Sequence, residues 1–565
     1  MDKYMLILGL TLAQVVISTS EDPLIQLPDG QIQGRQDVTS ENKAYYAFEK
    51  IPYSAPPIGD LRFKAPQPPE PWEGILNTTH LDISCYNMKM MMRAMPGVDQ
   101  SEDCLYLNVA TPKLPSEGDE ELLPVMVWIY GGAFMGGSAT NNPPDLFVNN
   151  DVILVSMNYR VGPFGFLSTQ DEVIPGNAGL KLLALKWTNQ NIHLFGGDPE
   201  RVTIFGQSAG GGSCAYQLLN QESSGLFQGA ILESGTFLST GMFQRNSRKV
   251  AFGTAATLNS TFESSDDSQA LLDFLLTLDA EDLNEAANQY NAASSNSWDD
   301  LTEPGRPYAP VIEVKNPDAV LTRKQYGLLK AGNILKVPVL MGFTSEEKIG
   351  PYQDPESLVD IAATIDENLD VIVPADMQIT DADSLTEMGR LIREIYTGGE
   401  TFSNDLGGAV RYGSDTFLSR AMIKHEEIFS QFAETYFYQF SYDGSFAHSE
   451  SPYEDAGNVG HGSELSYIFC SGTSCTDNSY PEEDLLARQR LITLWTNFAK
   501  YQHPTPEPLE LLQNVTWPAV STENGNFFYL DIGENLVVED HPKGNAFAMW
   551  VALYDSLGYD DFDTY

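Results

Sequence analysis

Short apolar runs recur along the chain, separated by segments with a helical pattern. Runs of strand length occupy residues 124–130, 152–157, 202–205, 230–232, 337–341 and 436–442, and residues 182–192 between two of them have a helical pattern. A strand that is apolar at successive positions is typical of a parallel sheet whose two faces are both covered by helices. Strands that alternate with helices therefore predict an α/β protein with a large, mostly parallel central sheet and helices on both faces.

The segments outside this alternation predict additions to the sheet. Residues 24–33 hold a Pro-Asp-Gly turn between two short strands, which predicts an opening hairpin. Residues 240–330 and 350–430 are polar and largely helical in pattern, so we expect helical insertions there. Within the second, Ser384-Leu385-Thr386-Glu387 predicts a capping box at the start of a helix that stops at Gly398-Gly399.

Candidate chemistry lies where one apolar run meets a glycine-rich turn. Val202-Thr203-Ile204-Phe205 leads into Gly206-Gln207-Ser208-Ala209-Gly210, and a helix-compatible segment follows. Strand, Gly-x-Ser-x-Gly turn and helix together predict a nucleophile elbow with Ser208 exposed at the turn. The glycines at minus two and plus two allow the backbones to approach closely. The N–H of Ala209, unpaired at the helix start, is a candidate donor to an oxyanion.

Composition predicts an exported, strongly acidic globular protein. The 565 residues carry 32 Lys and Arg against 78 Asp and Glu, a formal charge of −46 that should repel nucleic acid and anionic membranes. Residues 1–20 read as a signal peptide, with Lys3 before the apolar run 5–17, which is too short for a membrane anchor. We therefore expect residues 21–565 to form one secreted domain without membrane insertion.

Export makes the five cysteines candidates for disulfides. Cys85 and Cys104 flank one loop and Cys470 and Cys475 flank a tight one, so we expect these two bridges. Cys214, on the helix after the elbow, is then left as a free, buried cysteine. Sequons for N-glycosylation begin at three positions, Asn77, Asn259 and Asn514.

A candidate acid and a candidate base follow two of the expected strands later in the chain. Glu346 and Glu347 come after the run 337–341, and His461 lies between two glycines in a loop after the run 436–442. The order Ser, acid, His is that of α/β-hydrolases, in which imidazole takes the serine proton and a carboxylate fixes the imidazole tautomer. The seven histidines are otherwise scattered, and no Cys or His spacing suits zinc, so no metal or cofactor is expected.

Several further motifs along the chain are specific to one family. They are Gly59-Asp60-Leu61-Arg62-Phe63, Ser101-Glu102-Asp103-Cys104-Leu105-Tyr106-Leu107-Asn108-Val109, Tyr130-Gly131-Gly132-Ala133-Phe134, Asn158-Tyr159-Arg160-Val161-Gly162, Phe195-Gly196-Gly197-Asp198-Pro199 and Trp495-Thr496-Asn497-Phe498-Ala499-Lys500. With these motifs and the elbow, the chain resembles the type-B carboxylesterases, the family that includes cholinesterases, over nearly its whole length after residue 23.

The resemblance implies an α/β-hydrolase fold and a serine ester hydrolase that takes a small-molecule ester. It implies a catalytic triad of Ser208, Glu347 and His461, and oxyanion donors at the N–H groups of Gly131, Gly132 and Ala209. Ser234 resembles a serine that the family places near the histidine, and a Cys85–Cys104 bridge is implied as well. The family also contains non-catalytic adhesion and binding members, which typically lack the serine or the histidine.

Three positions depart from the family pattern. Lys348 stands where the family usually has glycine after the acid, which keeps Glu346 open as an alternative to Glu347. An Asp-Gln pair is absent after Gly179-Leu180-Lys181, so Arg160 lacks its usual carboxylate partner. Gly457 lies four residues before the histidine instead of three.

Two features favour a neutral, hydrophobic ester over a choline ester. A quaternary ammonium binds best over tryptophan, and cholinesterases place one between the two cysteines, whereas residues 86–103 hold no tryptophan. The same segment holds five methionines, Met88, Met90, Met91, Met92 and Met95, which either fill gaps or line an apolar site. Gln207 in Gly-Gln-Ser-Ala-Gly also resembles arthropod juvenile hormone esterases, which cleave terpenoid methyl esters.

Overall fold

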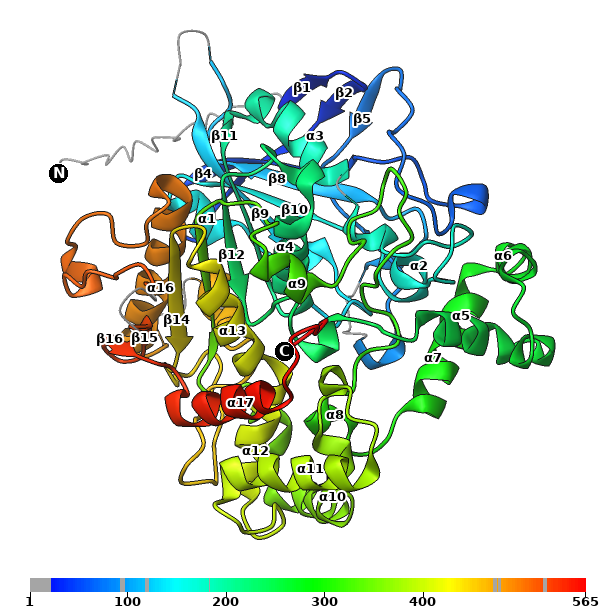
Figure 1. Ribbon diagram of the computed structural model, residues 1–565. Helices are drawn as coiled ribbons and strands as arrows, with labels where there is room; N and C mark the ends of the chain where they lie inside the picture. The colour runs from blue at the N-terminus through cyan, green and yellow to red at the C-terminus, as the bar shows by residue number, and fades with distance from the viewer. Residues whose placement is uncertain are drawn as a thin grey trace, which may run out of the picture.

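An eleven-stranded sheet runs through the molecule in the computed structural model, which describes residues 22–91, 97–116, 121–181, 183–470, 475, 479–521 and 526–565 (Figure 1). Its order is β16-β15-β14-β13-β12-β11-β9-β10-β8-β4-β3. The strands are β3 (Arg35–Val38), β4 (Ala44–Pro52), β8 (Tyr106–Thr111), β9 (Leu123–Ile129), β10 (Ile153–Met157), β11 (Gly197–Gln207), β12 (Gly229–Glu233), β13 (Val339–Thr344), β14 (Thr435–Phe440), β15 (Phe528–Ile532) and β16 (Leu536–Asp540).

The middle of the sheet, from β10 to β15, is parallel, and its two flanks are antiparallel. Every residue of β10, β12 and β13 is buried, as continuous apolar runs predict. Helix α4 (Ala209–Leu219) packs on β11 and β12, whereas α16 (Glu482–Tyr501) packs on β9 and β11. In Figure 1 these two helices lie on opposite sides of the central strands. The expected α/β-hydrolase architecture is thus confirmed.

The two predicted insertions are helical. The first holds α5 (Ser247–Ala256), α6 (Ser268–Leu276), α7 (Ala280–Ser294) and α8 (Asp299–Thr302), and α5 to α7 project at the right of Figure 1. The second holds α10 (Pro355–Glu367), α11 (Ala382–Thr397) and α12 (Leu406–Ser414) at the base of that view, beneath α17 (Gly544–Ser556). Further helices are α1 (Asp145–Asn149), α2 (Gly162–Phe166), α3 (Leu183–Asn191), α9 (Gln325–Lys330), α13 (Arg420–Phe429) and α14 (Leu465–Ile468).

The predicted hairpin and both disulfides are present. Strands β1 (Leu24–Leu27) and β2 (Gly30–Gln33) pair antiparallel, and β5 (Ile75–Asn77) joins them. Cys85 is bonded to Cys104 and Cys470 to Cys475, while Cys214 is buried and free. The bridges confirm the expected pairing, and burial raises the pKa of the Cys214 thiol well above its ordinary value.

Several predicted boundaries are wrong. Strand β13 continues to Thr344, so residues 342–344 belong to the strand and not to the loop after it. The cap of α11 is Asp381, whose carboxylate accepts from the N–H of Ser384, so the predicted capping box lies inside the helix. An Asp side chain at the true N-cap satisfies that donor first. The stop at Gly398 is confirmed, because this residue adopts a left-handed conformation at the C-cap.

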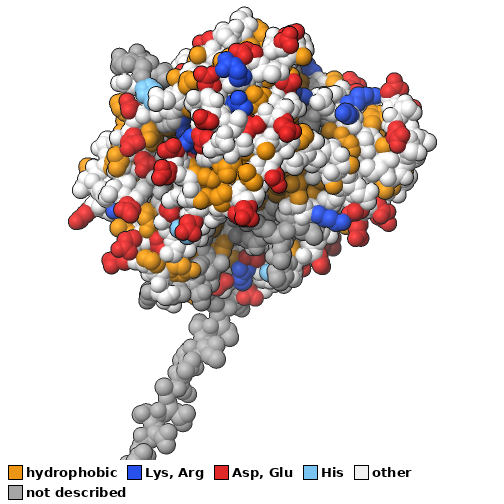
Figure 2. Space-filling view, turned by 90° about the horizontal axis from the view of Figure 1, so that it is seen from below, with side chains coloured by type: hydrophobic (Ala, Val, Ile, Leu, Met, Phe, Trp, Pro, Cys, Tyr) orange, Lys and Arg blue, Asp and Glu red, His pale blue; other side chains and the backbone are white. Residues whose placement is uncertain are grey.

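The acidic charge is spread over the surface. Figure 2, viewed from below Figure 1, shows acidic side chains scattered over the face with fewer basic ones among them. No helix in the described part of the chain is both long and apolar enough to cross a membrane. The expected signal peptide, residues 1–20, and two of the methionines, Met92 and Met95, lie outside the described residues.

Candidate active site

Strand β11 and helix α4 meet at Ser208 in a sharp turn. Ser208 has φ 59° and ψ −126°, a conformation that residues with a side chain rarely adopt. It is held there because its N–H donates to the carbonyl of Glu233 at 2.8 Å and its carbonyl accepts from Gly212 N–H at 2.9 Å. The turn places Ser208 at the carboxyl end of the sheet, at the start of a helix.

The two glycines of the elbow are required by close backbone contact. A Cβ added to Gly206 would lie 2.5 Å from the carbonyl oxygen of Ile129, and one added to Gly210 would lie 2.0 Å from the same atom. Real Cβ atoms do not approach so closely, so no larger residue fits without displacing β9 or the elbow. A Cβ added to Gly206 would also lie 2.6 Å from the carbonyl carbon of Gly210, so the two glycines approach each other as their spacing predicts.

Glu347, which is buried, and His461, which is partly exposed, form an acid–imidazole pair. His461 Nδ1 lies 2.5 Å from Glu347 Oε2, while Glu347 Oε1 accepts from Ser234 Oγ at 2.6 Å and from Thr344 N–H at 2.9 Å. Burial raises the pKa of Glu347, but the charge and hydrogen bond of His461, with the other two donors, outweigh burial and lower that pKa below its usual range. The carboxylate is therefore kept ionised against the imidazole.

Glu346, the neighbouring carboxylate, points elsewhere. Its Oε2 accepts from the N–H of Gly457 at 3.1 Å and lies 3.9 Å from Lys543 Nζ. The alternative that the sequence left open is thus distinguished by geometry, because the side chain that contacts His461 is Glu347.

Gln207, next to the nucleophile, packs on the imidazole. Its Nε2 lies 3.2 Å from His461 Nε2 and 3.5 Å from His461 Nδ1. A donor in the ring plane, on the Nε2 lone pair, would lie much farther from Nδ1 than from Nε2. The nearly equal distances therefore place the amide over the ring face, where an N–H interacts weakly with the π system and leaves the in-plane lone pair free.

Ser208 and His461 are not hydrogen-bonded to each other in the described structure. Their elements nevertheless converge, because Gln207 precedes Ser208 directly and contacts the ring. Apo geometry of this kind does not exclude a catalytic pair, since such bonds often form only in the substrate complex.

The three expected oxyanion donors lie in two segments that meet at Ser208. A Cβ added to Gly131 would lie 2.9 Å from Ser208 Cβ, so the segment after β9 lies directly against the nucleophile. Gly132 follows with φ +118°, and Ala209 begins α4. Within the described residues, no hydrogen bond uses the N–H groups of Gly131, Gly132 or Ala209. They are free to donate to an oxygen that becomes negative at the serine.

Lys348 has a buried role of its own. Its Nζ lies 2.7 Å from Glu303 Oε1 and 3.0 Å from Asp300 Oδ1, and it stands 4.2 Å from the centroid of the Phe417 ring. That ring meets His461 edge-on at 4.9 Å. The residue that replaces the family's usual glycine thus pairs with carboxylates of the first insertion and leaves the Glu347–His461 contact intact.

Arg160 lacks a carboxylate partner, as its sequence context predicts. Its Nη2 donates to the carbonyls of Lys64 and Ala178, while Nε and Nη1 are buried without a partner among the described residues. Burial lowers the pKa of Arg160 to about 10. No hydrogen bond joins Arg160 to Glu347 or His461 in the described structure, so the missing acidic residue leaves that pair unchanged.

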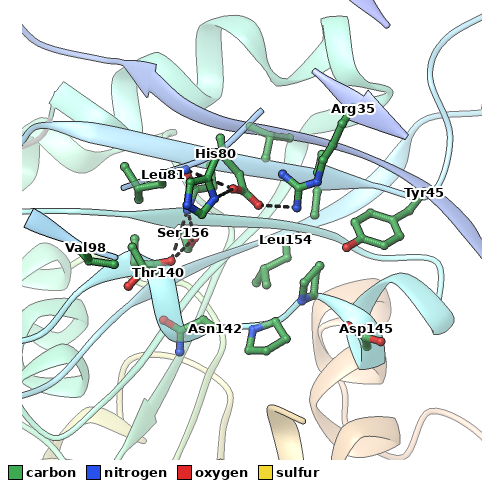
Figure 3. Close-up of a pocket in the computed structure, with 18 residues that line it drawn as sticks. Arg35, Tyr45, His80, Leu81, Val98, Thr140, Asn142, Asp145, Leu154 and Ser156 are labelled. Carbon is green, nitrogen blue, oxygen red and sulfur yellow. Dashed lines mark hydrogen bonds and ion pairs between the residues drawn. The ribbon is translucent and has the colours of Figure 1, made fainter. Parts of the chain in front are cut away.

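A cavity of about 440 Å³ lies on the antiparallel flank of the sheet, away from the elbow (Figure 3). In this view Arg35, Tyr45, His80 and Asp145 surround it. Arg35 Nη2 lies 2.8 Å from Glu49, and Glu49 also lies 3.7 Å from His80, which is largely exposed. The lining includes hydroxyl side chains such as Thr140 and Ser156, but among the described residues it holds no buried carboxylate that is paired with an imidazole.

A smaller cavity, of about 320 Å³, adjoins the elbow. Its lining includes Gly131, Gly132 and Gln207, with Trp128, Tyr130, Leu465, Phe469 and Met91 as its larger apolar or aromatic side chains. The lining contains no carboxylate among the described residues, and no group of three or more His, Cys, Asp or Glu in the described ranges is arranged to hold a metal ion. The lining thus combines apolar and aromatic side chains with uncharged polar ones such as Ser138, Asn142 and Ser466.

The carboxylesterase family model matches residues 21–550. The chain belongs to the carboxylesterase family. It is similar to the juvenile hormone esterase of Tribolium castaneum, with 34% identity over 89% of this chain and 87% of that protein, and to the para-nitrobenzyl esterase of Bacillus subtilis, with 31% identity over 91% and 95%. This family and these relatives make the chain a carboxylesterase, against the non-catalytic alternative.

A solved structure supports the same fold. The crystal structure of the juvenile hormone esterase of Manduca sexta, with OTFP covalently attached, superposes with a TM-score of 0.80 at 28% identity. The match covers 95% of this chain and all of that chain. The resemblance inferred from motifs is thereby confirmed for family and fold.

Sequence reasoning missed several neighbours of the carboxylesterase site. Leu465 and Phe469 lie four and eight residues after His461, a helical spacing that was available as a signal. Phe417 lies in the second insertion and reaches His461 only through folding. No local pattern marks such a contact.

Proposed function

We propose that this carboxylesterase is a serine hydrolase that acts through an acyl-enzyme formed on Ser208. The observation that carries the proposal is the contact of the buried Glu347 carboxylate with His461, beside a strained elbow serine. With Nδ1 donating to Glu347, His461 presents an unprotonated Nε2 that can accept the Ser208 proton.

The reaction proceeds in two balanced halves. Ser208 Oγ attacks the ester carbonyl while His461 Nε2 takes its proton, and the N–H groups of Gly131, Gly132 and Ala209 stabilise the oxyanion. The C–O bond to the alcohol then breaks, and His461 returns the proton to the departing oxygen. Water attacks the acyl-enzyme by the same route and releases the acid.

The substrate in this proposal is a neutral hydrophobic ester, such as a terpenoid methyl ester. Support comes from a lining that has apolar and aromatic side chains and no charged one among the described residues, from Gln207 where the family usually has a carboxylate, and from the similarity to two proteins named juvenile hormone esterases. Trp128 is the tryptophan of the lining, and its ring packs against Phe205 and Phe469 at 4.8 Å in both cases. Trp128 therefore belongs to the core, and its ring face is not open to a cation.

Secretion and glycosylation belong to the same proposal. Two disulfides favour an oxidising compartment, and Asn77 and Asn514 are exposed, while Asn259 is half-buried. Expression in an insect secretory system, followed by peptide mass mapping before and after deglycosylation, tests both points. A mature chain that keeps residues 1–20 would contradict the signal.

The nucleophile is tested with Ser208→Ala and an organophosphate. Ester hydrolysis should fall by several orders of magnitude while the thermal unfolding temperature stays close to that of the native enzyme. Mass mapping should place the adduct of the native enzyme on Ser208 alone. Wild-type turnover in a pure Ser208→Ala preparation would contradict the mechanism.

Substrate class is tested by comparing kcat/KM for a terpenoid methyl ester, a short aryl ester and acetylthiocholine. We expect the terpenoid ester to give the highest value and the choline ester the lowest. Preference for the aryl ester would remove the hormone assignment only. Preference for acetylthiocholine would contradict the neutral-substrate assignment altogether.

A further inference from the structure

The segment that carries Gly131 and Gly132 is conformationally strained. Ala133 and Phe134, which follow the two glycines, have φ 55° and φ 59°, and Gly137 has φ +125°. Two consecutive non-glycine residues in the left-handed region persist only where the surrounding structure over-determines them. The oxyanion loop, residues 131–137, therefore depends on contacts from outside itself.

Some of these contacts are internal to the oxyanion loop or come from α2. The N–H groups of Met135 and Gly136 donate to the carbonyl of Gly132, at 2.9 and 3.1 Å. Gly162, the first residue of α2, donates to the carbonyl of Phe134 at 2.6 Å. These bonds close the turn but leave its far end, at Gly137, to be held by another element.

Asn87, in the loop closed by the Cys85–Cys104 bridge, holds that far end. Its Oδ1 accepts from Gly137 N–H, and the N–H of Met88 donates to the carbonyl of Met135 at 2.8 Å. The fit is tight, because a Cβ added to Gly136 would lie 2.7 Å from Asn87 Oδ1. The disulfide loop is thus bound to the oxyanion loop by two hydrogen bonds, one to the Asn87 side chain and one from the backbone of Met88.

The Asn87 side chain is itself fixed at both polar ends. It is 2% exposed, and its Nδ2 donates to the carbonyl of Cys85 at 2.8 Å. Although Asn87 lines the site cavity, its Oδ1 and Nδ2 are both engaged by protein backbone. Its geometry is that of a brace between two loops and not of a substrate ligand.

Helix α7 of the first insertion is hydrogen-bonded to the backbone of Asn87 and of Lys89. Asn284 Nδ2 donates to the carbonyl of Asn87 at 3.0 Å. One turn later, Asn288 Oδ1 accepts from the N–H of Lys89 at 2.8 Å. Only the first of these two bonds involves Asn87, the residue that is bonded to Gly137 of the oxyanion loop.

We propose that Asn87 is a positioning residue for ester hydrolysis, which holds Gly131 and Gly132 in the conformation that stabilises the oxyanion, and that Asn284 of α7 reinforces it. The inference rests on the proposed function of Ser208 and the oxyanion loop. It assigns a role to the disulfide loop and the insertion helix beyond lining the cavity. Because the brace acts on the transition state, its loss should lower kcat more than it raises KM.

The test compares Asn87→Ala with Asn288→Ala, a matched control that removes an asparagine bond to the same disulfide loop without touching the oxyanion loop. Each purified variant is assayed for kcat, KM and the Ki of a trifluoromethyl ketone, whose adduct with Ser208 places an oxyanion in the hole. We expect Asn87→Ala to lower kcat about 10- to 100-fold, to raise Ki by a similar factor and to change KM by no more than about threefold. Asn288→Ala should leave kcat and Ki within about twofold.

A second variant keeps the test decisive if Asn87→Ala does not fold. Asn284→Ala removes only the support from α7, and we expect kcat to fall and Ki to rise together by about three- to tenfold. The inference is overturned if the folded variants keep native kcat and Ki, or if KM rises while the inhibitor binds unchanged. Failure of the proposed function is distinguishable, because native enzyme would then not bind the ketone, or Ser208→Ala would keep its turnover.

Discussion

Replacement of Glu347 by Gln should prevent His461 from acting as a base, although glutamine has nearly the same size and shape as glutamate. Glu347 Oε1 accepts from Ser234 and from Thr344 N–H, and Oε2 faces His461 Nδ1. An amide has one acceptor oxygen, which two donors hold at the Oε1 position. Its NH₂ group then faces Nδ1 and selects the tautomer whose Nε2 carries the proton, so Ser208 has no base.

The reverse orientation of the amide, which would restore an acceptor for His461 Nδ1, is unfavourable. It would turn the NH₂ group toward the Ser234 hydroxyl and the buried Thr344 N–H, and would leave the latter unsatisfied at a cost of about 1–3 kcal/mol. An acid-to-amide change in a serine triad lowers kcat about 10⁴-fold, which corresponds to about 5 kcal/mol of transition-state stabilisation. We expect a loss of this order for Glu347→Gln.

The assay is kcat/KM for a chromogenic ester, with active sites titrated by an organophosphate and folding checked by thermal unfolding. Glu346→Gln is the matched control, because Glu346 is adjacent, equally buried and bonded to Gly457 instead of His461. It should keep kcat/KM within about tenfold. A larger loss for Glu346→Gln, or more than a tenth of native activity in Glu347→Gln, would refute the reasoning.

Three other perturbations test the surroundings of the triad. Lys348→Met should lower the free energy of unfolding by about 3 kcal/mol in urea titrations, because it leaves the buried Glu303 without one of its cations, and an unchanged midpoint would contradict this. Gln207→Glu should shift the acidic limb of the kcat/KM–pH profile to higher pH, since a carboxylate on the ring favours protonated His461, whereas Gln207→Met should not. Burial raises the pKa of Glu233 to about 8, so its folded state holds a proton that the unfolded chain releases near 4.5. The stability that this proton contributes is full below pH 4.5 and is lost as the pH rises toward 8, by up to about 1.4 kcal/mol per pH unit. Urea titrations at pH 5 and pH 8 should therefore show a smaller fall in the free energy of unfolding for Glu233→Gln than for the native enzyme.

Local sequence is sufficient where the physical cause is local. The elbow could be placed because the tight turn brings Gly206 and Gly210 together within five residues, so that a Cβ on Gly206 would lie 2.6 Å from the carbonyl carbon of Gly210. Central strands such as β10 and β12 could be placed because burial on both faces makes them continuously apolar. The edge strand β16 and its neighbour β15 were not predicted, since partial exposure leaves them with mixed polarity.

Tertiary structure decides between residues that are equivalent in sequence. Glu346 and Glu347 are adjacent carboxylates, and only the approach of Ser234, Thr344 and His461 to Glu347 separates them. The face contact of Gln207 with the imidazole likewise depends on two elements that lie far apart along the chain. Such contacts leave no periodic or compositional signal, because their energy comes from the packing of distant segments and not from the conformation of either one.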